Sequence, residues 1–305
     1  MKRTHFAKFL LPLTGMSLLA MPLLGLGWFT LHRPPQTNLE KPLFRGVTYR
    51  REFRRSPRPI MLHIVTVDLT APGIKLLVTP SEKRSIESEI NARTTSEFLQ
   101  EFGVQVAINA SFFHPFKEVT PWDFYPHPGD RVAAVGQAIA NGVEYSAPLA
   151  AWPVLCISSQ QRARILAAAQ CPAQTAQGVA GSSLVAQHGR VIPAPVGTAD
   201  SDGNYSRTAV AVDRTGQRLW ILAVDDKQWL YSEGVTLTEL GEIAIAEGAD
   251  AAINLDGGGS TTLVTAQAKG FQLLNAPVHT KIPMRERPVA NHLGIYALPT
   301  HASVP

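Results

Sequence analysis

The sequence lacks the motifs by which proteins commonly bind metal ions or nucleic acids. No His-x-His or Asp-x-His pair occurs, and the only two cysteines, Cys156 and Cys171, have no histidine or further cysteine at metal-ligand spacing. No segment combines aromatic and basic residues as RNA-binding motifs do. We therefore expect no metal, no cofactor and no nucleic-acid partner.

Charged residues are also scarce, at 17% of the 305 residues, against about 25% in an average soluble protein. The net charge of +4 comes from the N-terminal fifth, because residues 32–59 hold eight basic and two acidic residues. Residues 60–305 have more acids than bases. The basic balance is therefore a local feature and does not indicate nucleic-acid binding.

One long uncharged run stands out near the N-terminus, from Phe9 to Leu31. Lys2, Arg3 and Lys8 precede it. A cleaved signal peptide has an apolar stretch of about 7–15 residues followed by a small-residue cleavage site. This run is longer and ends without such a site. We therefore favour a membrane anchor through residues 9–31; a cleaved signal peptide, which would leave a secreted protein, is the alternative.

The rest of the chain divides into three parts behind the segment 1–31. Residues 32–43 are polar and proline-rich and are expected to form a tether, residues 44–298 to form a single domain, and residues 299–305 to form a tail. β-branched runs predict hairpins over 60–80, 182–192 and 207–225. The expected fold is α+β: a strand-rich mixed sheet with a few helices, in a single domain behind an N-terminal membrane anchor.

Two segments share one plan. Residues 94–103 and 236–247 each begin with Thr-x-x-Glu, which predicts a capping box, and a glycine follows each helix. A strand follows each helix, over 104–109 and 251–255. The shared pattern of the two segments ends with the pair Ile-Asn, at Asn109 and Asn254. The repeat suggests a duplicated unit whose strand ends meet at the site, although two ordinary helix–strand units would also give this pattern.

Cys156 and Cys171 are separated by fourteen residues. In an oxidising compartment such a pair can form a disulfide, which is the interpretation we favour. Two unrelated buried thiols remain the alternative.

The segment NLDGGGSTTL (254–263) is the strongest chemical signal. Asp256 follows a buried strand, and sheets often place ligands at the ends of their strands. Three glycines come next, where exposed backbone N–H groups can cradle an anion. No lysine follows as in a Walker loop. A plain glycine turn is the alternative, but it does not explain the neighbouring hydroxyl residues.

The segment AINLDGGGSTTLV resembles the signature of the phosphodiester glycosidase family. Other segments are similar to the family's motifs in the same order, among them VAINASFF, SSLVAQHGRVI, RTAVAVDRTGQ and RERPVANHLGIY, and the resemblance spans residues 44–298. One departure is NASFF, because relatives often carry a glycine pair where this chain has Ala110 and Ser111.

The resemblance implies a set of site residues. As catalytic residues it implies Asp256, Arg207 and Asn109, and as substrate-binding residues Gly257, Gly258, Gly259, Ser260, Thr261 and Asn291, with Arg287 and His114 as weaker candidates. Arginine suits bidentate contact with phosphate. Asn109 can either bind a sugar hydroxyl or orient Asp256. Arg287 can instead pair with its neighbour Glu286.

The resemblance further implies a hydrolase that cleaves the glycosidic bond of a sugar-1-phosphodiester such as a GlcNAc-1-phosphodiester. Ordinary glycosidases use two carboxylates, one of which protonates a poor leaving group. A phosphate monoester leaves readily, so one carboxylate, Asp256, can suffice as base or nucleophile. Arg207 and the amides of Gly257–Gly259 would hold the phosphate. Asp213 and Asp123 are reserve candidates for a second carboxylate.

Two other functions compete with this expectation. A non-catalytic envelope module would bind a phosphosugar or glycan through the same glycine loop. A metal-dependent phosphodiesterase ranks third, because its clustered ligands are missing from the sequence. Since glycan phosphodiesters occur in cell envelopes and secretory compartments, we expect an extracytoplasmic location.

Overall fold

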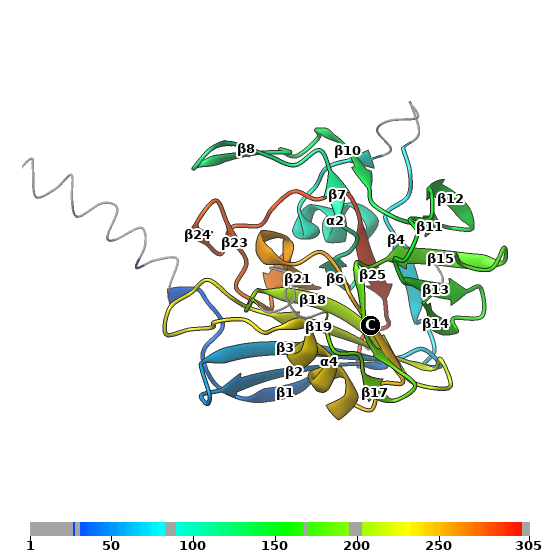
Figure 1. The fold of residues 1–305 in the computed structure, drawn as a ribbon, viewed down its shortest axis with the longest axis horizontal. Helices are drawn as coiled ribbons and strands as arrows, with labels where there is room; N and C mark the ends of the chain where they lie inside the picture. Colours follow the sequence, from blue (N-terminus) through cyan, green and yellow to red (C-terminus); the bar gives the residue numbers. More distant parts are fainter. Residues whose placement is uncertain (1–26, 28–30, 83–89, 168–169, 195–202, 301–305) are drawn as a thin grey trace, which may run out of the picture.

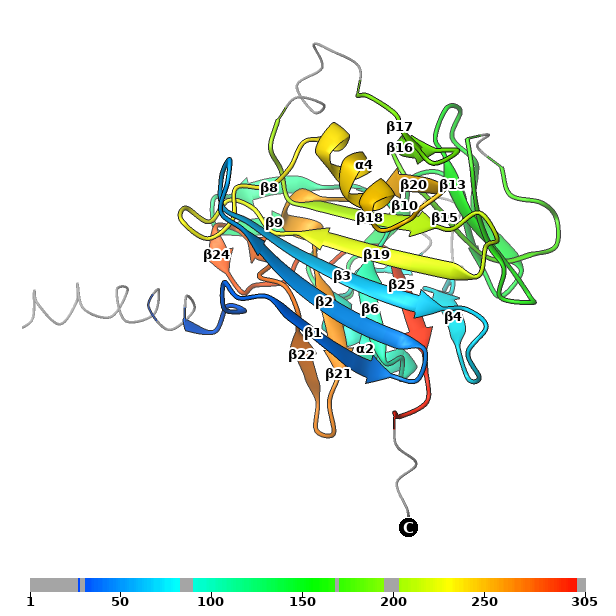
Figure 2. The same cartoon turned by 90° about the horizontal axis from the view of Figure 1, so that it is seen from below.

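The computed structural model describes residues 27, 31–82, 90–167, 170–194 and 203–300. Within these residues two sheets lie face to face and each carries one helix on its outer side (Figures 1 and 2). The larger sheet has the order β1 (Leu39–Phe44), β2 (Val47–Arg54), β3 (Ile60–Asp68), β19 (Arg218–Val224), β18 (Arg207–Val212), β20 (Ala251–Asn254), β16 (Ser183–Gln187) and β17 (Arg190–Val191). The facing sheet has the order β22 (Phe271–Leu273), β21 (Leu263–Ala266), β6 (Val106–Asn109), β25 (His292–Tyr296) and β4 (Lys75–Val78).

A third sheet and three small ones complete the described structure. The third sheet has the order β12 (Val143–Ser146), β11 (Ala138–Ala140), β15 (Thr175–Ala180), β13 (Val154–Ser158) and β14 (Ala163–Leu166). The small sheets are β5 (Ile90–Asn91), β10 (Arg131–Ala134) and β7 (Phe113–His114); β8 (Lys117–Thr120) and β9 (Asp123–Tyr125); and β23 (Val278–His279) and β24 (Ile282–Pro283).

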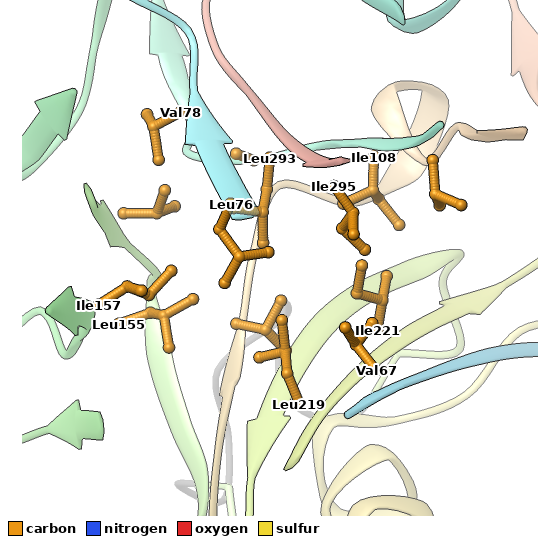
Figure 3. Close-up of a cluster of buried hydrophobic side chains, with 14 of the residues drawn as sticks. Val67, Leu76, Val78, Ile108, Leu155, Ile157, Leu219, Ile221, Leu293 and Ile295 are labelled. Carbon is orange, nitrogen blue, oxygen red and sulfur yellow. The ribbon is translucent and has the colours of Figure 1, made fainter. Parts of the chain in front are cut away.

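The main core lies between the two facing sheets and is closed on one side by the third. Leu219 and Ile221 of β19 point toward Ile108 of β6 and Leu293 of β25, as Figure 3 shows. Alternate residues of β19, such as Leu222, instead face α4 (Leu237–Ala246). Because successive side chains of a strand point to opposite faces, burial on both faces explains the continuous apolar run of β19.

Both expected helices form with their predicted caps. α2 (Thr95–Phe102) is capped by Thr94 and α4 by Thr236, each in a capping box with the glutamate three residues later. α2 ends at Gly103, whose φ of 65° is in the left-handed region that glycine adopts readily. The two helix–strand units of the sequence are thus confirmed as local structure.

The expectation of a mixed sheet was wrong for the part of the chain that the structure describes. Every ladder between its named strands is antiparallel. α4 does join two strands of the same direction, β19 and β20, but both pair with β18, which lies between them. The crossover therefore produces no parallel ladder.

Two further expectations need correction. The segments 60–69 and 74–80 do not form a hairpin, because β3 pairs with β2 and β19 whereas β4 pairs with β25 in the facing sheet. The segment 32–43, expected to be a tether, contains most of β1, which pairs with β2. The sheet thus begins earlier than the proline-rich composition suggested.

The predicted hairpins over 207–225 and 182–192 form as β18–β19 and β16–β17. Cys156 and Cys171 form a disulfide with Cα atoms 5.7 Å apart. Among the described residues no helix is long and apolar enough to cross a membrane. The uncharged run of residues 9–31 lies almost entirely outside those residues, so the anchor remains a prediction.

Candidate active site

The ends of β6 and β20 meet, as the helix–strand repeat led us to expect. The backbone N–H of Asp256 donates to the carbonyl of Ala110 at 3.0 Å. The buried side chain of Asn109 donates to the carbonyl of Asp256 at 2.6 Å and accepts from the N–H of Thr262 at 3.1 Å. Asn109 therefore fixes the backbone on both sides of the glycine loop, which corresponds to the orienting role rather than to a sugar contact.

The glycine loop forms a short 3-10 turn, Gly258–Ser260. The N–H of Gly257 bonds to the carboxylate of Asp256, and the N–H of Gly258 donates to the carbonyl of Ser206 at 2.9 Å. The expected phosphate cradle of glycine amides is therefore not available at these two positions, because the protein itself uses the donors. The glycines instead permit close packing: a Cβ on Gly257 would lie 2.5 Å from the Ser206 carbonyl oxygen.

Asp256 is a buried carboxyl group, with 8% of its surface exposed. Burial raises its pKa to about 6, because the charged form loses its hydration. The hydroxyl of Ser260, the charge of Arg287 and the N–H of Gly257 act in the opposite direction and stabilise the carboxylate. A carboxyl group with a pKa near 6 can exchange a proton near neutral pH, as a general acid or base must.

The guanidinium whose charge stabilises the carboxylate of Asp256 belongs to Arg287. From the sequence alone, Arg287 was only a weaker candidate. Its Nη1 donates to Oγ of Ser260 at 3.1 Å, and Ser260 in turn bonds to the carboxylate of Asp256. The guanidinium lies 4.5 Å from the ring centroid of Phe116, a cation–π contact. Arg287 does not pair with Glu286, which accepts from the N–H of Ser96 at the start of α2.

His279 on β23 belongs to the same cluster and was missed by the sequence reasoning. Its Nδ1 accepts from Nε of Arg287 at 3.3 Å, because arginine can only donate. Burial and the neighbouring positive charges, first that of Arg287, lower its pKa to about 4, so the ring is neutral at neutral pH. Its ring packs edge-on against Phe124 of β9, with centroids 5.4 Å apart. No sequence motif marks this histidine.

Arg207 lies on the other side of the glycine loop. Its Cα would be 3.6 Å from a Cβ on Gly257. The guanidinium donates to the carbonyls of Val235 and Gly203, each at 3.2 Å, and its charge acts on the carboxyl group of Asp226. Arg207 thus stands beside the loop, where its guanidinium contacts backbone carbonyls and the ring of Tyr205 and its charge acts on Asp226.

Asp226 is a second buried carboxyl group near the loop, and the sequence reasoning overlooked it. Burial raises its pKa, and it accepts from the N–H of Ser206. The hydroxyl of Ser206 donates to the carbonyl of Gly258 at 2.7 Å. Ser206 therefore connects Asp226 to the loop that carries Asp256. In the sequence, Asp226 is marked only by its position directly after the predicted hairpin over 207–225.

The remaining expected binding residues are placed mainly in the supporting structure. Asn291 accepts from the N–H of Ser111 at 2.8 Å, and Thr261 contacts the hydroxyl of Thr208 at 3.2 Å. Both side chains are buried. His114 is exposed on β7. The groups that act on the carboxylate of Asp256 are instead Ser260, Arg287 and Gly257.

The two reserve carboxylates lie elsewhere. Asp213 caps the turn between β18 and β19, where it accepts from the N–H groups of Gln217 and Arg218 at 2.8 Å. Arg207 stands at the opposite end of β18, about 20 Å away at the usual rise per residue. Asp123 binds Nε2 of His127 at 2.6 Å in an exposed pair. Asp226, rather than either of these, is the second carboxyl group near the loop.

Metal ligands do not gather in the described part of the chain. No group of three histidine, cysteine, aspartate or glutamate residues there has the geometry to hold a metal ion.

Solved structures show where this fold occurs. A hypothetical protein from Synechocystis is 17% identical with a TM-score of 0.60, covering 83% of this chain; this chain spans 62% of that protein. The zebrafish N-acetylglucosamine-1-phosphodiester alpha-N-acetylglucosaminidase catalytic domain, auto-inhibited by its pro-peptide, is 17% identical with a TM-score of 0.57, covering 88% of this chain and 92% of its own. A putative exported protein from Burkholderia pseudomallei is 14% identical with a TM-score of 0.56, over 79% and 74% of the two chains. At these identities the likeness establishes the fold alone.

Sequence comparison supplies the family. No curated protein matches the chain. The sequence profile of the phosphodiester glycosidase family, however, matches residues 102–296, which include Asn109, Asp256 and Arg287. The match covers more than half of the chain, and the earlier resemblance is confirmed: this protein belongs to the phosphodiester glycosidase family.

Proposed function

We propose that the protein is a hydrolase that cleaves the glycosidic bond of a sugar-1-phosphodiester, with a GlcNAc-1-phosphodiester as the first substrate to test. One observation carries the proposal. A buried carboxyl group with a pKa near 6, Asp256, is joined through Ser260 to the partly buried guanidinium of Arg287. This arrangement pairs a base with a cation, which are the two groups that a reaction expelling phosphate needs.

The reaction breaks the bond between the anomeric carbon and the phosphate oxygen. The phosphate monoester leaves with the bonding electrons, and a hydroxyl group from water replaces it on the sugar. As a base, Asp256 takes the proton of that water; as a nucleophile, it first bonds to the anomeric carbon and water then releases the sugar. Because the leaving group is already acidic, neither route needs a strong general acid.

Negative charge develops on the departing phosphate, and a fixed cation in a water-poor site stabilises it. In this proposal Arg287 and the hydroxyl of Ser260 meet the phosphate, in place of the amides of Gly257 and Gly258, which bond within the protein. His279 holds Nε of Arg287 and, being neutral, adds no competing positive charge. Arg207 is a second cation beside the loop, with a supporting role for the phosphate.

We also place the protein outside the cytoplasm, held to a membrane through residues 9–31. The disulfide between Cys156 and Cys171 supports an oxidising compartment, because such bonds are rare in the cytosol. The long uncharged run supports an anchor, as argued from its length. Detection of the intact N-terminus in a membrane fraction tests this placement; a mature protein that begins beyond residue 31 would contradict it.

Isotope-labelled water tests the bond that is cut. We expect hydrolysis of a GlcNAc-1-phosphodiester in ¹⁸O-water to place the label in the free sugar and none in the phosphate. Label in the phosphate would mean cleavage of the P–O bond and would refute the glycosidase proposal. Binding of the phosphodiester without turnover would identify a non-catalytic glycan-binding module instead.

A further inference from the structure

Two large apolar side chains are exposed in the loop between β19 and α4. Trp229 has 83% and Leu230 64% of its surface exposed, and Lys227 beside them is exposed as well. The loop is drawn in yellow at one end of the molecule in both ribbon views, the same end as the blue segment that begins at residue 31 (Figures 1 and 2). We call Trp229 and Leu230 the apolar loop tip.

The apolar loop tip stands on a well-anchored base. Gln228 donates to the carbonyl of Ala276 at 2.8 Å, and the carboxylate of Asp225 accepts from the N–H of Ala276 at 3.0 Å. Tyr231, the next residue after the tip, is buried. Leu230 itself has φ of 63°, a conformation that is unfavourable for a bulky side chain. The fold thus holds Leu230 in solvent at a conformational cost, with Trp229 exposed beside it.

The chain that follows the uncharged run binds this same loop. Arg33 donates to the side chain of Gln228 at 3.0 Å, and its guanidinium lies 4.5 Å from the ring centroid of Tyr231. Gln36 donates to the carbonyl of Leu230 at 2.7 Å. The point where residues 9–31 end is therefore fixed within a few residues of the apolar loop tip, whatever the length of the run itself.

We propose that Trp229 and Leu230 enter the interface of the lipid bilayer that holds residues 9–31. Tryptophan is enriched at membrane interfaces, where its ring fits both the headgroups and the acyl chains. Lys227 adds attraction to anionic headgroups. A lipid surface accounts for two exposed apolar side chains placed beside the expected anchor. The contact makes the N-terminal segment and the loop a two-point attachment that fixes the orientation of the domain.

This orientation brings the candidate site to the membrane. The β8–β9 hairpin, with Trp122 exposed to 67% at its turn, and the β23–β24 hairpin lie at the same end as the loop (Figures 1 and 2). Phe124 of β9 contacts His279 of β23, which holds Arg287. Resting on the proposed hydrolase function, the inference names a substrate class: sugar-1-phosphodiesters whose second alcohol is a membrane lipid.

Fluorescence quenching tests the bilayer contact without using activity. The full chain with Trp28→Phe is reconstituted in nanodiscs of phosphatidylcholine and phosphatidylglycerol with brominated acyl chains. We expect the quenched fraction of the tryptophan signal to fall when Trp229→Phe is added. Trp220→Phe, which removes a buried tryptophan of β19, is the matched control and should not lower it. Equal quenching with and without Trp229 would overturn the proposal.

Turnover then tests the substrate class. The double variant Trp229→Ser, Leu230→Ser should lower the rate on a lipid-linked GlcNAc-1-phosphodiester in the same nanodiscs by about tenfold or more, since two apolar groups leave the bilayer. The rate on a water-soluble ester should stay the same. Val143→Ser with Leu149→Ser, at exposed positions at and just beyond β12 at the opposite end, is the control. An equal effect on both esters would refute the lipid substrate, whereas failure of the wild type on both would refute the hydrolase and leave the quenching result valid.

Discussion

The two helix–strand units of this protein follow the same plan but contribute different things to the site. α2 and β6 lead to Asn109, and α4 and β20 lead to Asn254. The side chain of Asn109 bonds to the backbone of Asp256 and Thr262. The side chain of Asn254 donates to Ser182 at 3.0 Å, and its Oδ1 has no partner among the described residues. The same residue at the same place in the pattern therefore supports the glycine loop in one unit only.

The two units differ more strongly at the position two residues after each asparagine. Ser111 follows Asn109 at the position where Asp256 follows Asn254. Ser111 is buried and donates to the carbonyl of Ala180 at 3.1 Å, a purely internal bond. Asp256 is buried too, but it carries the titratable group of the site. The comparison teaches that the first unit supplies support and the second supplies charge.

Substitution at these matched positions should give the largest contrast. We expect Asp256→Asn to lower kcat on a GlcNAc-1-phosphodiester by about 10³-fold or more, because it removes the reacting carboxylate. Ser111→Ala should lose the two buried hydrogen bonds that its hydroxyl makes with Ala180 and Asn291, worth about 1 kcal/mol of stability each, and leave kcat within about threefold of the wild type. Steady-state kinetics on the two variants, with circular dichroism to verify folding, measures the contrast. Normal turnover by folded Asp256→Asn would remove this residue from the mechanism.

The pH dependence of kcat/KM tests whether the second unit, through Asp256, carries the reacting charge. A base or nucleophile must be deprotonated, so kcat/KM should rise with pH through about 6, the raised pKa of Asp256. Arg287→Gln removes a charge that stabilises the carboxylate, so the rise should move to higher pH while kcat falls by about 10²–10³-fold. The exposed neighbour Arg285, whose Nη1 binds Thr280, provides the control variant Arg285→Gln. A pH profile that is the same in both variants would contradict the link between Arg287 and Asp256.

The stability of the protein should show the same titration with a defined sign. The pKa of Asp256 is higher in the folded state than the ordinary value of 3.8, so folding favours the protonated form. Its contribution to stability is therefore fully present below about pH 4 and is lost as the pH rises through about 6. The loss amounts to at most about 3 kcal/mol, and Asp256→Asn should remove this pH dependence.

Sequence reasoning predicted the local structure well because its signals are local. Thr94 and Thr236 marked both helix starts, since a capping box needs only four residues. The hairpin of β18 and β19 was equally clear from its turn. Pairing between distant strands was not, and the expected partner of β3 proved to be wrong because β4 crosses to the facing sheet. Nothing within residues 60–80 encodes that choice.

The site was predictable only where a motif carried it. Asp256 stood in a glycine-rich segment, and the strand before it could be read from its apolar residues. His279 and Asp226 reach the site through tertiary packing alone, from β23 and from the loop after β19. Arg287 was ranked below Arg207 because the sequence suggested a pairing with Glu286, which instead binds the N-terminus of α2. Contacts of this kind depend on which elements meet, and the sequence pattern does not specify it.

The most direct test of the two units concerns the two asparagines. Asn109→Ala should lower the free energy of unfolding by about 2–4 kcal/mol, because it leaves buried backbone groups of Asp256 and Thr262 without partners. Asn254→Ala should cost no more than about 1 kcal/mol, since it removes one hydrogen bond together with an oxygen that already lacks a partner. Urea denaturation of both variants at pH 7 measures the difference. Equal losses would mean that the two strand ends are equivalent supports, and the asymmetry would then lie in Asp256 alone.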